Sequence, residues 1–374
     1  MTTVDNSDHL TDQQLLDSAL VGVREILPEG WTIEAIPQSP DSNLDPGNTL
    51  VTANHRGTGS TAAIVELRRT FTPQDAKRLL GDSVAAKLRA MTGNYPILII
   101  APYLSPRTRQ SLEEQHVSYI DLAGDIHLEL QSLFVHIERT SRNPNPTRTR
   151  SPGLSGASGG RVARVLVDAF PPYGVTEIAK AAGVDLGYTS RILERLSEEA
   201  LIDREPRGKV TDVDWPGLLR ARAQHLDLLG LRAAKRFVAR QGARETLASL
   251  AEDPPQGYWV VTGSFAASEI APVATPALLV AYAMDPNVIA NRLELLPADE
   301  GADVVLIRPS NYGPFDRPRP NAGIIWAGLS QIALDCLSGN GRMPAEGEAV
   351  IEWMAEHLEE WRLPIRELPP PAGK

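Results

Sequence analysis

Residues 161–215 read RVARVLVDAFPPYGVTEIAKAAGVDLGYTSRILERLSEEALIDREPRGKVTDVDW. Apolar side chains recur at helical spacing between Val162 and Ala169, which predicts a first helix with one buried face. Pro171 and Pro172 follow, and two consecutive prolines cannot continue a helix, so they end it. This helix begins the stretch of the chain in which the order of elements is clearest.

Two further helices and a hairpin are predicted after the prolines. Thr176 is the expected N-cap of a short helix, TEIAKAA, and Gly183 is the expected left-handed residue that closes it. A third helix is predicted over residues 187–200. The segment DREPRGKVTDV that follows has the pattern of a strand, an Arg/Gly turn and a second strand. This order is typical of a winged helix-turn-helix domain, which we expect over residues 161–215.

The polar face of the third helix predicts contact with double-stranded DNA. The major groove admits one helix, whose first residues reach the base edges. Basic residues on the wing are expected to meet the neighbouring phosphates. The alternative is a winged helix that only packs against protein. The expected DNA-contacting residues are Thr176, Tyr188, Thr189, Ser190, Arg191, Arg195, Arg204, Arg207 and Lys209.

Charge is unevenly spread along the 374 residues. The net charge is −10, yet residues 138–240 hold 18 Lys and Arg against 12 Asp and Glu, while the remainder holds 19 against 35. A basic middle between acidic flanks is expected where one module contacts DNA. Four arginines just before the first helix are expected either to contact the DNA phosphates or to lie in a solvated linker: Arg139, Arg142, Arg148 and Arg150.

Composition indicates a cytoplasmic protein. No apolar run approaches the roughly 18 residues of a membrane span, so no membrane contact is expected. The polar N-terminus has no features of a signal peptide. The single cysteine, Cys336, excludes an internal disulfide and is expected to be a small core residue.

Residues 1–142 are expected to form an α/β domain around a mixed sheet. A helix is predicted over residues 11–27, followed by strands TLVTAN and TAAIVELRR, helix PQDAKRLLGDSVAAKLRAM, strand PILIIAPYL, helix PRTRQSLEEQ and strand VSYIDLAGDIHLEL. Asp121 and Asp125 are expected to make a bulge or turn within the last strand. His116, His127 and His136 show no metal-ligand spacing within one element, so no metal or other cofactor is expected.

The order of these elements over residues 30–140 resembles the PD-(D/E)xK restriction-endonuclease-like superfamily. The resemblance implies a metal-binding acid in the strand motif ExK, which here reads Glu66-Leu67-Arg68, and an upstream acid, for which Asp45 is the candidate. Arg68 stands where the family has a lysine, and a permanent guanidinium cation does not take part in proton transfer. We therefore expect an inactive nuclease-like domain. A metal-dependent nuclease is the alternative.

Four segments are expected around and beyond the winged helix. Residues 143–160 are rich in Pro, Gly, Ser and Thr, which predicts a flexible linker. A helical connector is predicted over residues 216–254, a second α/β domain over residues 255–364, and a disordered Pro-rich tail over residues 365–374.

Within the second α/β domain, Gly263-Ser264 follows a strand and precedes a helix. This pair resembles the opening of nucleotidyltransferase folds, where the turn cradles a triphosphate. The next strand has no Asp-x-Asp pair, and its first carboxylate is Asp285. Two-metal chemistry therefore lacks its ligands, and no catalysis is expected there.

Three separated motifs together resemble the abortive-infection antitoxin regulators of type IV toxin–antitoxin systems. They are VTEIAKAAGVDLGYTSRILERLSEEALIDREPRGKVTDVDWPGLLR, YWVVTGSFAAS and SQIALDCLSGNGRMPAEGEAVIEWM, all between residues 160 and 360. The resemblance implies a non-enzymatic transcriptional regulator of α/β multidomain architecture. A homodimer is expected, because two-fold operators favour dimers. A toxin or other protein partner, neutralised by contact, is the alternative role.

Overall fold

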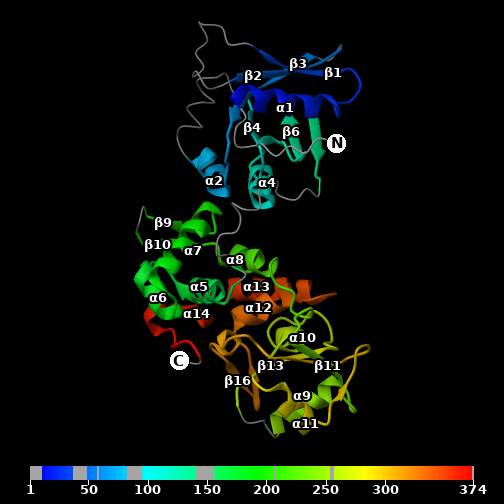
Figure 1. Ribbon diagram of the computed structural model, residues 1–374, viewed down its shortest axis with the longest axis vertical. Coiled ribbons are helices and arrows are strands. Elements are labelled where there is room, and N and C mark those ends of the chain that lie inside the picture. The colour runs from blue at the N-terminus through cyan, green and yellow to red at the C-terminus, as the bar shows by residue number, and fades with distance from the viewer. Residues whose placement is uncertain are drawn as a thin grey trace. The chain divides into compact units, whose positions relative to one another are not determined.

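The structure is a computed structural model in which the chain forms two compact units, one of residues 1–150 with 198–200 and the other of residues 151–197 with 201–374 (Figure 1). It describes residues 11–36, 49–56, 59–81, 95–139, 154, 156–205, 208–252 and 257–372. Both units combine helices with a mixed sheet, which confirms the expected α/β class. No helix among the described residues is both long and apolar enough to span a membrane.

The N-terminal unit is built on a seven-stranded sheet in the sequential order β1-β2-β3-β4-β5-β6-β7. Strands β3 and β4, and β4 and β5, pair in parallel, whereas the other neighbours are antiparallel. Its elements are α1 (Asp12–Arg24), β1 (Trp31–Ile36), β2 (Thr49–His55), β3 (Gly59–Leu67), α2 (Pro73–Gly81), β4 (Ile97–Ala101), α4 (Pro106–Glu113), β5 (Ser118–Asp121), β6 (Ile126–Leu130) and β7 (Leu133–Ile137).

Helices cover both faces of this sheet, and strand β4 shows why. All five of its residues are buried. Leu98 and Ile100 belong to the core that includes the apolar side of α1, while Ile97 and Ile99 belong to the core that includes α4. Because side chains alternate between the two faces of a strand, a strand buried on both sides is apolar throughout.

One strand of this unit, β1, was not predicted from the sequence. The predicted strand over residues 117–130 is in fact a hairpin, in which β5 and β6 flank a turn. Asp121 makes that turn, as expected, because its Oδ1 accepts hydrogen bonds from the backbone N–H groups of Gly124 and Asp125. Asp45 and the predicted helical residues 82–91 lie outside the described residues.

The C-terminal unit begins with three helices and a two-stranded antiparallel hairpin. These are α5 (Ala157–Asp168), α6 (Val175–Ala182), α7 (Leu186–Glu198), β9 (Ile202–Arg204) and β10 (Val210–Val213), followed by α8 (Trp215–Ala223). Val210 of β10 also forms a β-bridge with Tyr173, so the hairpin is held to the segment between α5 and α6.

A second seven-stranded sheet follows in the order β14-β11-β15-β13-β12-β17-β16. Its helices and those of the first part share one continuous hydrophobic core. The elements are β11 (Ala234–Val238), α9 (Ala243–Glu252), β12 (Trp259–Thr262), α10 (Gly263–Ser268), β13 (Leu279–Ala283), α11 (Pro286–Arg292), β14 (Leu296–Pro297), β15 (Val304–Ile307), β16 (Arg319–Asn321), β17 (Ile324–Trp326), α12 (Leu329–Leu337), α13 (Met343–Glu356) and α14 (Leu358–Trp361). Cys336 is buried in this core, as expected.

Three predictions for the first part of this unit need correction. The N-cap of α6 is Gly174 rather than Thr176, and residues 157–160 at the end of the predicted linker are helical, since α5 begins at Ala157. Residues 234–238 of the predicted helical connector form strand β11, because they pair with β15 in the sheet. Tertiary pairing overrides local helical periodicity here.

The C-terminal segment also differs from the disordered tail predicted for it. Strand β18 (Leu363–Pro364) pairs in parallel with β8 (Ala169–Phe170), and a short 3-10 helix covers Ile365–Glu367. Leu368 packs against the core, and the backbone N–H of Ala372 donates to Asp316 Oδ1. These contacts order a proline-rich sequence that has no helical or strand periodicity of its own.

Candidate nucleic-acid interface

Helix α7 is held by apolar contacts on one side and by a capping interaction at its start. Ile192, Leu193 and Leu196 are buried in the core shared with α5 and α6. Asp185 precedes the helix, and its Oδ1 accepts a 2.9 Å hydrogen bond from the backbone N–H of Tyr188. Gly183 takes the expected left-handed conformation, with φ of 61°. The first turn of α7 therefore projects from a fixed scaffold.

The opposite side of α7 carries the polar residues that the sequence singled out. Ser190 and Arg191 are exposed, and Tyr188 is half-buried. The guanidinium carbon of Arg191 lies 5.9 Å from the centre of the Tyr188 ring, within the range of a cation–π contact. Arg195, one turn further along, is half-buried. These residues form a polar strip along the first half of the helix.

Thr189 does not belong to this strip. Its side chain is completely buried, at 0 % exposure, and its hydroxyl donates a 2.9 Å hydrogen bond to the backbone carbonyl oxygen of Asp185. Residue 189 lies three and four positions before Ile192 and Leu193, which places it on the buried face of the helix. The predicted DNA contact at Thr189 is therefore wrong.

The remaining predicted contacts lie on α6 and on the hairpin. Thr176 is exposed in the first turn of α6, and Lys209 is exposed just before β10. Arg204 is half-buried at the end of β9, and its Nε atom is buried without a hydrogen-bond partner among the described residues. Arg207 lies outside the described residues.

Acidic groups interrupt this surface. Glu194 is exposed on α7, between Arg191 and Arg195 in sequence, and Glu205 is exposed beside the hairpin turn. Carboxylates at such positions repel phosphate, so they oppose nonspecific binding to a DNA backbone. The balance of charges therefore favours an interface that depends on a few well-placed donors.

A polar network joins helix α5, and with it α6 and α7, to the helices that pack on the C-terminal sheet. Arg164 of α5 hydrogen-bonds Gln331 of α12 and forms a 3.1 Å ion pair with Asp316. Gln331 Nε2 donates to Asp335 Oδ1 at 2.6 Å. Arg220 of α8 adds a bidentate ion pair with Glu348 of α13. The scaffold of α7 is thus continuous with the rest of the C-terminal unit.

Asp335 lies at the centre of that network. Besides Gln331, it accepts hydrogen bonds from the hydroxyls of Thr262 at 2.7 Å and Tyr282 at 2.9 Å. Complete burial nevertheless raises the pKa of Asp335 to about 6, because the three hydrogen bonds only partly offset the loss of solvation. This carboxyl group is a proton-binding site inside the core.

Gly263 and Ser264 make a closed turn. Ser264 is buried, and its hydroxyl donates a 2.5 Å hydrogen bond to Glu346 of α13. Gly263 has φ of 68°, and a side chain there would press against Val280 and Met343. A phosphate at this turn would meet the carboxylate of Glu346, so the turn serves packing between β12, α10 and α13.

In the N-terminal unit, Glu66 lies at the end of β3 and forms an ion pair with Arg68. The carboxylate of Glu66 is therefore held by a neighbouring guanidinium cation. Glu66 is half-buried and Arg68 is exposed. Asp45, its proposed companion, lies outside the described residues.

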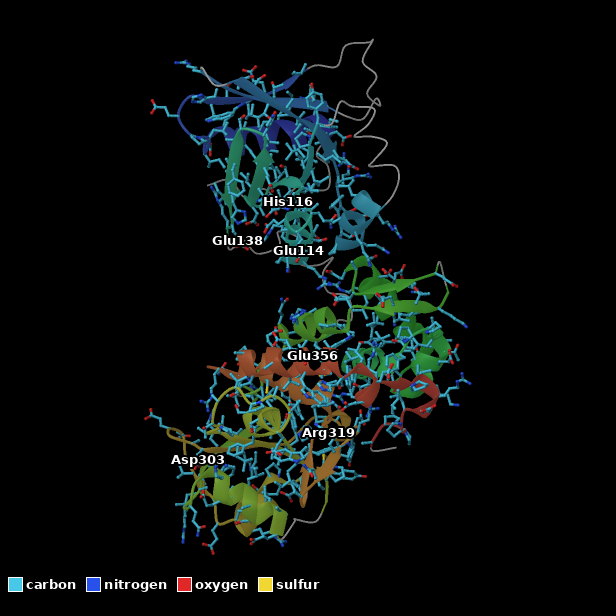
Figure 2. The ribbon with its side chains drawn as sticks, turned by 180° about the vertical axis from the view of Figure 1, so that it is seen from behind. Glu114, His116, Glu138, Asp303, Arg319 and Glu356 are labelled. Atoms are coloured by element: carbon cyan, nitrogen blue, oxygen red, sulfur yellow. The ribbon has the colours of Figure 1, made fainter. Side chains whose placement is uncertain are left out.

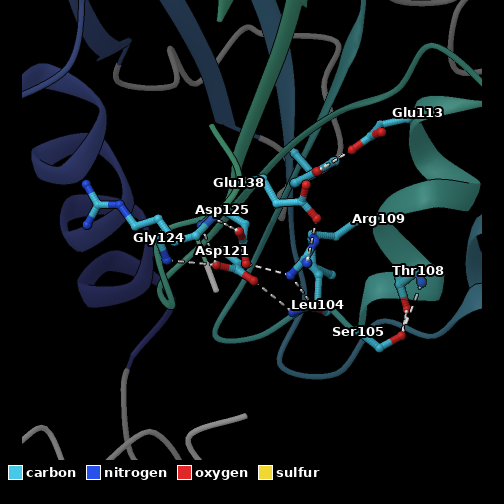
Figure 3. Close-up of polar contacts among 11 residues, drawn as sticks. Leu104, Ser105, Thr108, Arg109, Glu113, Asp121, Gly124, Asp125 and Glu138 are labelled. Carbon is cyan, nitrogen blue, oxygen red and sulfur yellow. Dashed lines mark hydrogen bonds and ion pairs between the residues drawn. The ribbon is translucent and has the colours of Figure 1, made fainter. Parts of the chain in front are cut away.

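Asp121 and Asp125 belong to a separate buried network around α4 (Figure 3). Arg109 of α4 forms a 2.5 Å ion pair with Asp125, whose other oxygen accepts from the backbone N–H of Arg139 at 2.6 Å. Asp121 Oδ2 accepts from the backbone N–H of Leu104 at 3.2 Å. Burial raises the pKa of Asp121. Both carboxylates are satisfied by protein donors, so they fix the helix to the hairpin.

The structure also brings together three residues that the sequence left apart. Glu113 on α4, His127 on β6 and His136 on β7 each offer a ligand atom within 4.8 Å of the other two. The strand register pairs His127 directly with His136. His116, labelled in Figure 2, lies just beyond α4, and its Nδ1 atom is instead 3.1 Å from Glu129 Oε2. Only the register of β6 and β7, which the sequence does not give, could have revealed this cluster.

Comparison with known proteins identifies no relative for the chain. No protein-family model, no curated protein and no solved structure matches it.

Proposed function

We propose that this chain is a sequence-specific, non-enzymatic DNA-binding transcriptional regulator that inserts α7 into the major groove. The observation that carries the proposal is the polar strip on α7. Ser190 and Arg191 are exposed in the first half of the helix, while its other face is locked in the core. The first residues of a recognition helix are the ones that reach base edges.

The three helices and hairpin support a winged helix-turn-helix assignment for this part of the chain. In that assignment, α6 crosses the backbone, α7 occupies the groove, and the β9–β10 hairpin is the wing. Arg191 would donate to a guanine edge, with Ser190, Tyr188 and Arg195 beside it. Lys209 would contact phosphate from the wing, together with Arg204 and Arg207, while Thr176 would approach the backbone from α6.

The two sheets then serve as scaffolds. The N-terminal unit would be an inactive PD-(D/E)xK-like domain, since Arg68 pairs with Glu66. The C-terminal sheet would belong to an inactive nucleotidyltransferase-like domain, since the Ser264 hydroxyl donates its hydrogen bond to Glu346. The whole would be a cytoplasmic homodimer related to the abortive-infection antitoxin regulators, with dimerisation matching a two-fold operator.

The proposal is tested by fluorescence anisotropy with duplexes enriched from a random pool. Arg191→Ala should lose base discrimination, whereas Lys209→Ala should weaken all duplexes alike and reduce the salt slope by about one unit. Arg232→Ala is the matched control, because Arg232 is exposed in the segment between α8 and β11, away from the interface. Equal losses for Arg191→Ala and Arg232→Ala would count against α7 as the recognition helix.

A further inference from the structure

The face of the N-terminal sheet beside α4 holds an unusual pair of imidazoles. His127 and His136 are register partners on β6 and β7, and their Nδ1 atoms face each other at 3.1 Å. A neutral imidazole carries one proton, so two nitrogens at this distance are either a donor and an acceptor or two lone pairs directed at one cation. The distance alone does not distinguish these arrangements.

The second nitrogen of His127 favours the cation. The side chain of His127 is only 8 % exposed, and its Nε2 atom is buried without a hydrogen-bond partner among the described residues. The nearest charged oxygen is Glu129 Oε2, 3.6 Å away. A histidine that binds metal through one nitrogen typically directs the other, as N–H, toward a carboxylate. With Nδ1 occupied by a metal, Nε2–H would point at Glu129.

The carboxylate of Glu113 completes the cluster from α4. One of its oxygens lies within 4.8 Å of the ligand atoms of both histidines. Its Oε1 accepts a 2.5 Å hydrogen bond from the hydroxyl of Tyr119, which lies opposite His127 on β5. This hydrogen bond orients the carboxylate. Figure 3 labels Glu113 on α4 and marks the polar contact of its carboxylate with a dashed line.

We propose that Glu113, His127 and His136 bind a divalent transition-metal ion, with Zn²⁺ the expected occupant. Two imidazoles and one carboxylate form a ligand set that suits zinc. Two Zn–N bonds of about 2.0–2.1 Å at a tetrahedral angle place their nitrogens about 3.3 Å apart. The 3.1 Å separation of the two Nδ1 atoms is close to that value.

Bound metal would tie α4 to the last two strands of the sheet. Strand β7 is an edge strand, and it exposes Phe134 at 66 % as well as His136. An edge strand is the part of a sheet most prone to open or to pair with another chain. The site would fix this edge to the helix, which gives the metal a stabilising role independent of DNA binding.

The test uses the full-length chain, freed of metal with a chelator and titrated with Zn²⁺ against a chromogenic competitor. We expect one tight equivalent of Zn²⁺ per chain. Co²⁺ titrated in its place should give the intense visible absorption of a tetrahedral or five-coordinate site with nitrogen ligands. The chain has seven histidines, so the variants below decide which of them bind the metal.

His136→Ala should weaken Zn²⁺ binding at least about tenfold, because losing only an outer-shell partner of a ligand already costs about 10–100-fold in metal affinity. His136 is exposed, so this variant should fold, and circular dichroism checks that it does. Glu113→Gln should weaken binding similarly while keeping the size of the side chain. His225→Ala is the matched control, because His225 is exposed and lies in the C-terminal unit, outside the cluster.

Loss of tight binding in both variants, with binding kept in the control, would support the site. The absence of a stoichiometric site, or equal affinity in His136→Ala and the parent chain, would overturn the proposal. In that case the two imidazoles make only a direct hydrogen bond. Neither result depends on whether the chain binds DNA.

Discussion

Thr189 and Ser190 are neighbours on α7 with opposite environments. The hydroxyl of Thr189 is buried and donates a hydrogen bond to the carbonyl oxygen of Asp185 at 2.9 Å, whereas Ser190 is exposed. Helical geometry turns successive residues by about 100°, so one position faces the core and the next faces solvent. Two similar polar residues therefore have different roles, one structural and one proposed for DNA contact.

Replacing these two residues should separate stability from DNA affinity. Thr189→Val keeps the shape of the side chain but removes the hydrogen bond, which should lower the free energy of unfolding by about 1–2 kcal/mol. Affinity for a selected duplex should stay within about twofold at a temperature where the variant is folded. Urea denaturation and anisotropy measure the two quantities. A large affinity loss with normal stability would return Thr189 to the interface.

Ser190→Ala should have the reverse profile. Its hydroxyl is exposed, so the free energy of unfolding should change by less than about 0.5 kcal/mol. Loss of a base contact should weaken binding to the selected duplex by about 1 kcal/mol or more, with a smaller effect on unrelated duplexes. The same two assays apply. Unchanged discrimination between duplexes would remove Ser190 from the groove.

Arg191→Ala should lose roughly 1–3 kcal/mol of binding free energy, because a bidentate contact with a base edge is worth about that much. The loss should concentrate on one base pair of the site, which a panel of single substitutions in the duplex would identify. Arg191→Lys should recover only part of it, since an ammonium lacks the planar pair of donors. A uniform loss over the whole panel would instead place Arg191 on phosphate.

Glu194→Gln should strengthen DNA binding. Glu194 is exposed on α7 three residues after Arg191, so removing its charge lowers repulsion from phosphate. We expect affinity to rise by about two- to fivefold at low salt, with the gain shrinking as salt screens the charge. Anisotropy over a salt series checks this result. A loss of affinity would show that Glu194 accepts a hydrogen bond from a base instead.

Asp335 should make the C-terminal unit less stable as pH rises. Its pKa is about 6 when folded, against 3.8 for an ordinary aspartate, so the folded chain holds this proton more tightly than the unfolded chain. The associated stability is complete below pH 3.8 and is lost as pH rises through about 6. At about 1.4 kcal/mol for each unit of pKa, the loss is on the order of 3 kcal/mol.

Asp335→Asn removes that titration while leaving an oxygen to accept from Tyr282. As pH rises from about 4 to about 7.5, the unfolding free energy of the parent chain should fall relative to that of the variant by an amount on the order of 3 kcal/mol. Urea denaturation at both pH values measures it. Asp299→Asn, at an exposed position, is the control. A difference independent of pH would mean that Asp335 is ionised in both states throughout.

The sequence was most informative where a local pattern and the final environment agree. The strand around Leu98 is apolar throughout and is buried on both faces, and Gly183 takes the left-handed conformation that its position after α6 predicted. In α7, the apolar spacing placed Ile192, Leu193 and Leu196 correctly in the core. These features depend on residues within one or two helical turns of each other.

The sequence failed where the outcome depends on distant partners. Strand β11 exists because it pairs with β15, more than sixty residues later in the chain, although its own sequence has helical periodicity. Thr189 is a different case, because its spacing of three and four residues from Ile192 and Leu193 already places it on the buried face, where its hydroxyl bonds to the carbonyl oxygen of Asp185. His127 and His136 meet only through the register of β6 and β7. Neither of the two strand pairings is encoded in a local pattern.

The central claim is that α7 reads DNA sequence, and selection from a random duplex pool tests it most directly. The full-length chain is incubated with the pool over a salt series in the absence of added metal, and the bound fraction is sequenced. We predict enrichment of a compact, two-fold symmetric motif, with a steep dependence of affinity on salt. Weak binding without an enriched motif would contradict the claim and leave the three helices as a protein-packing module.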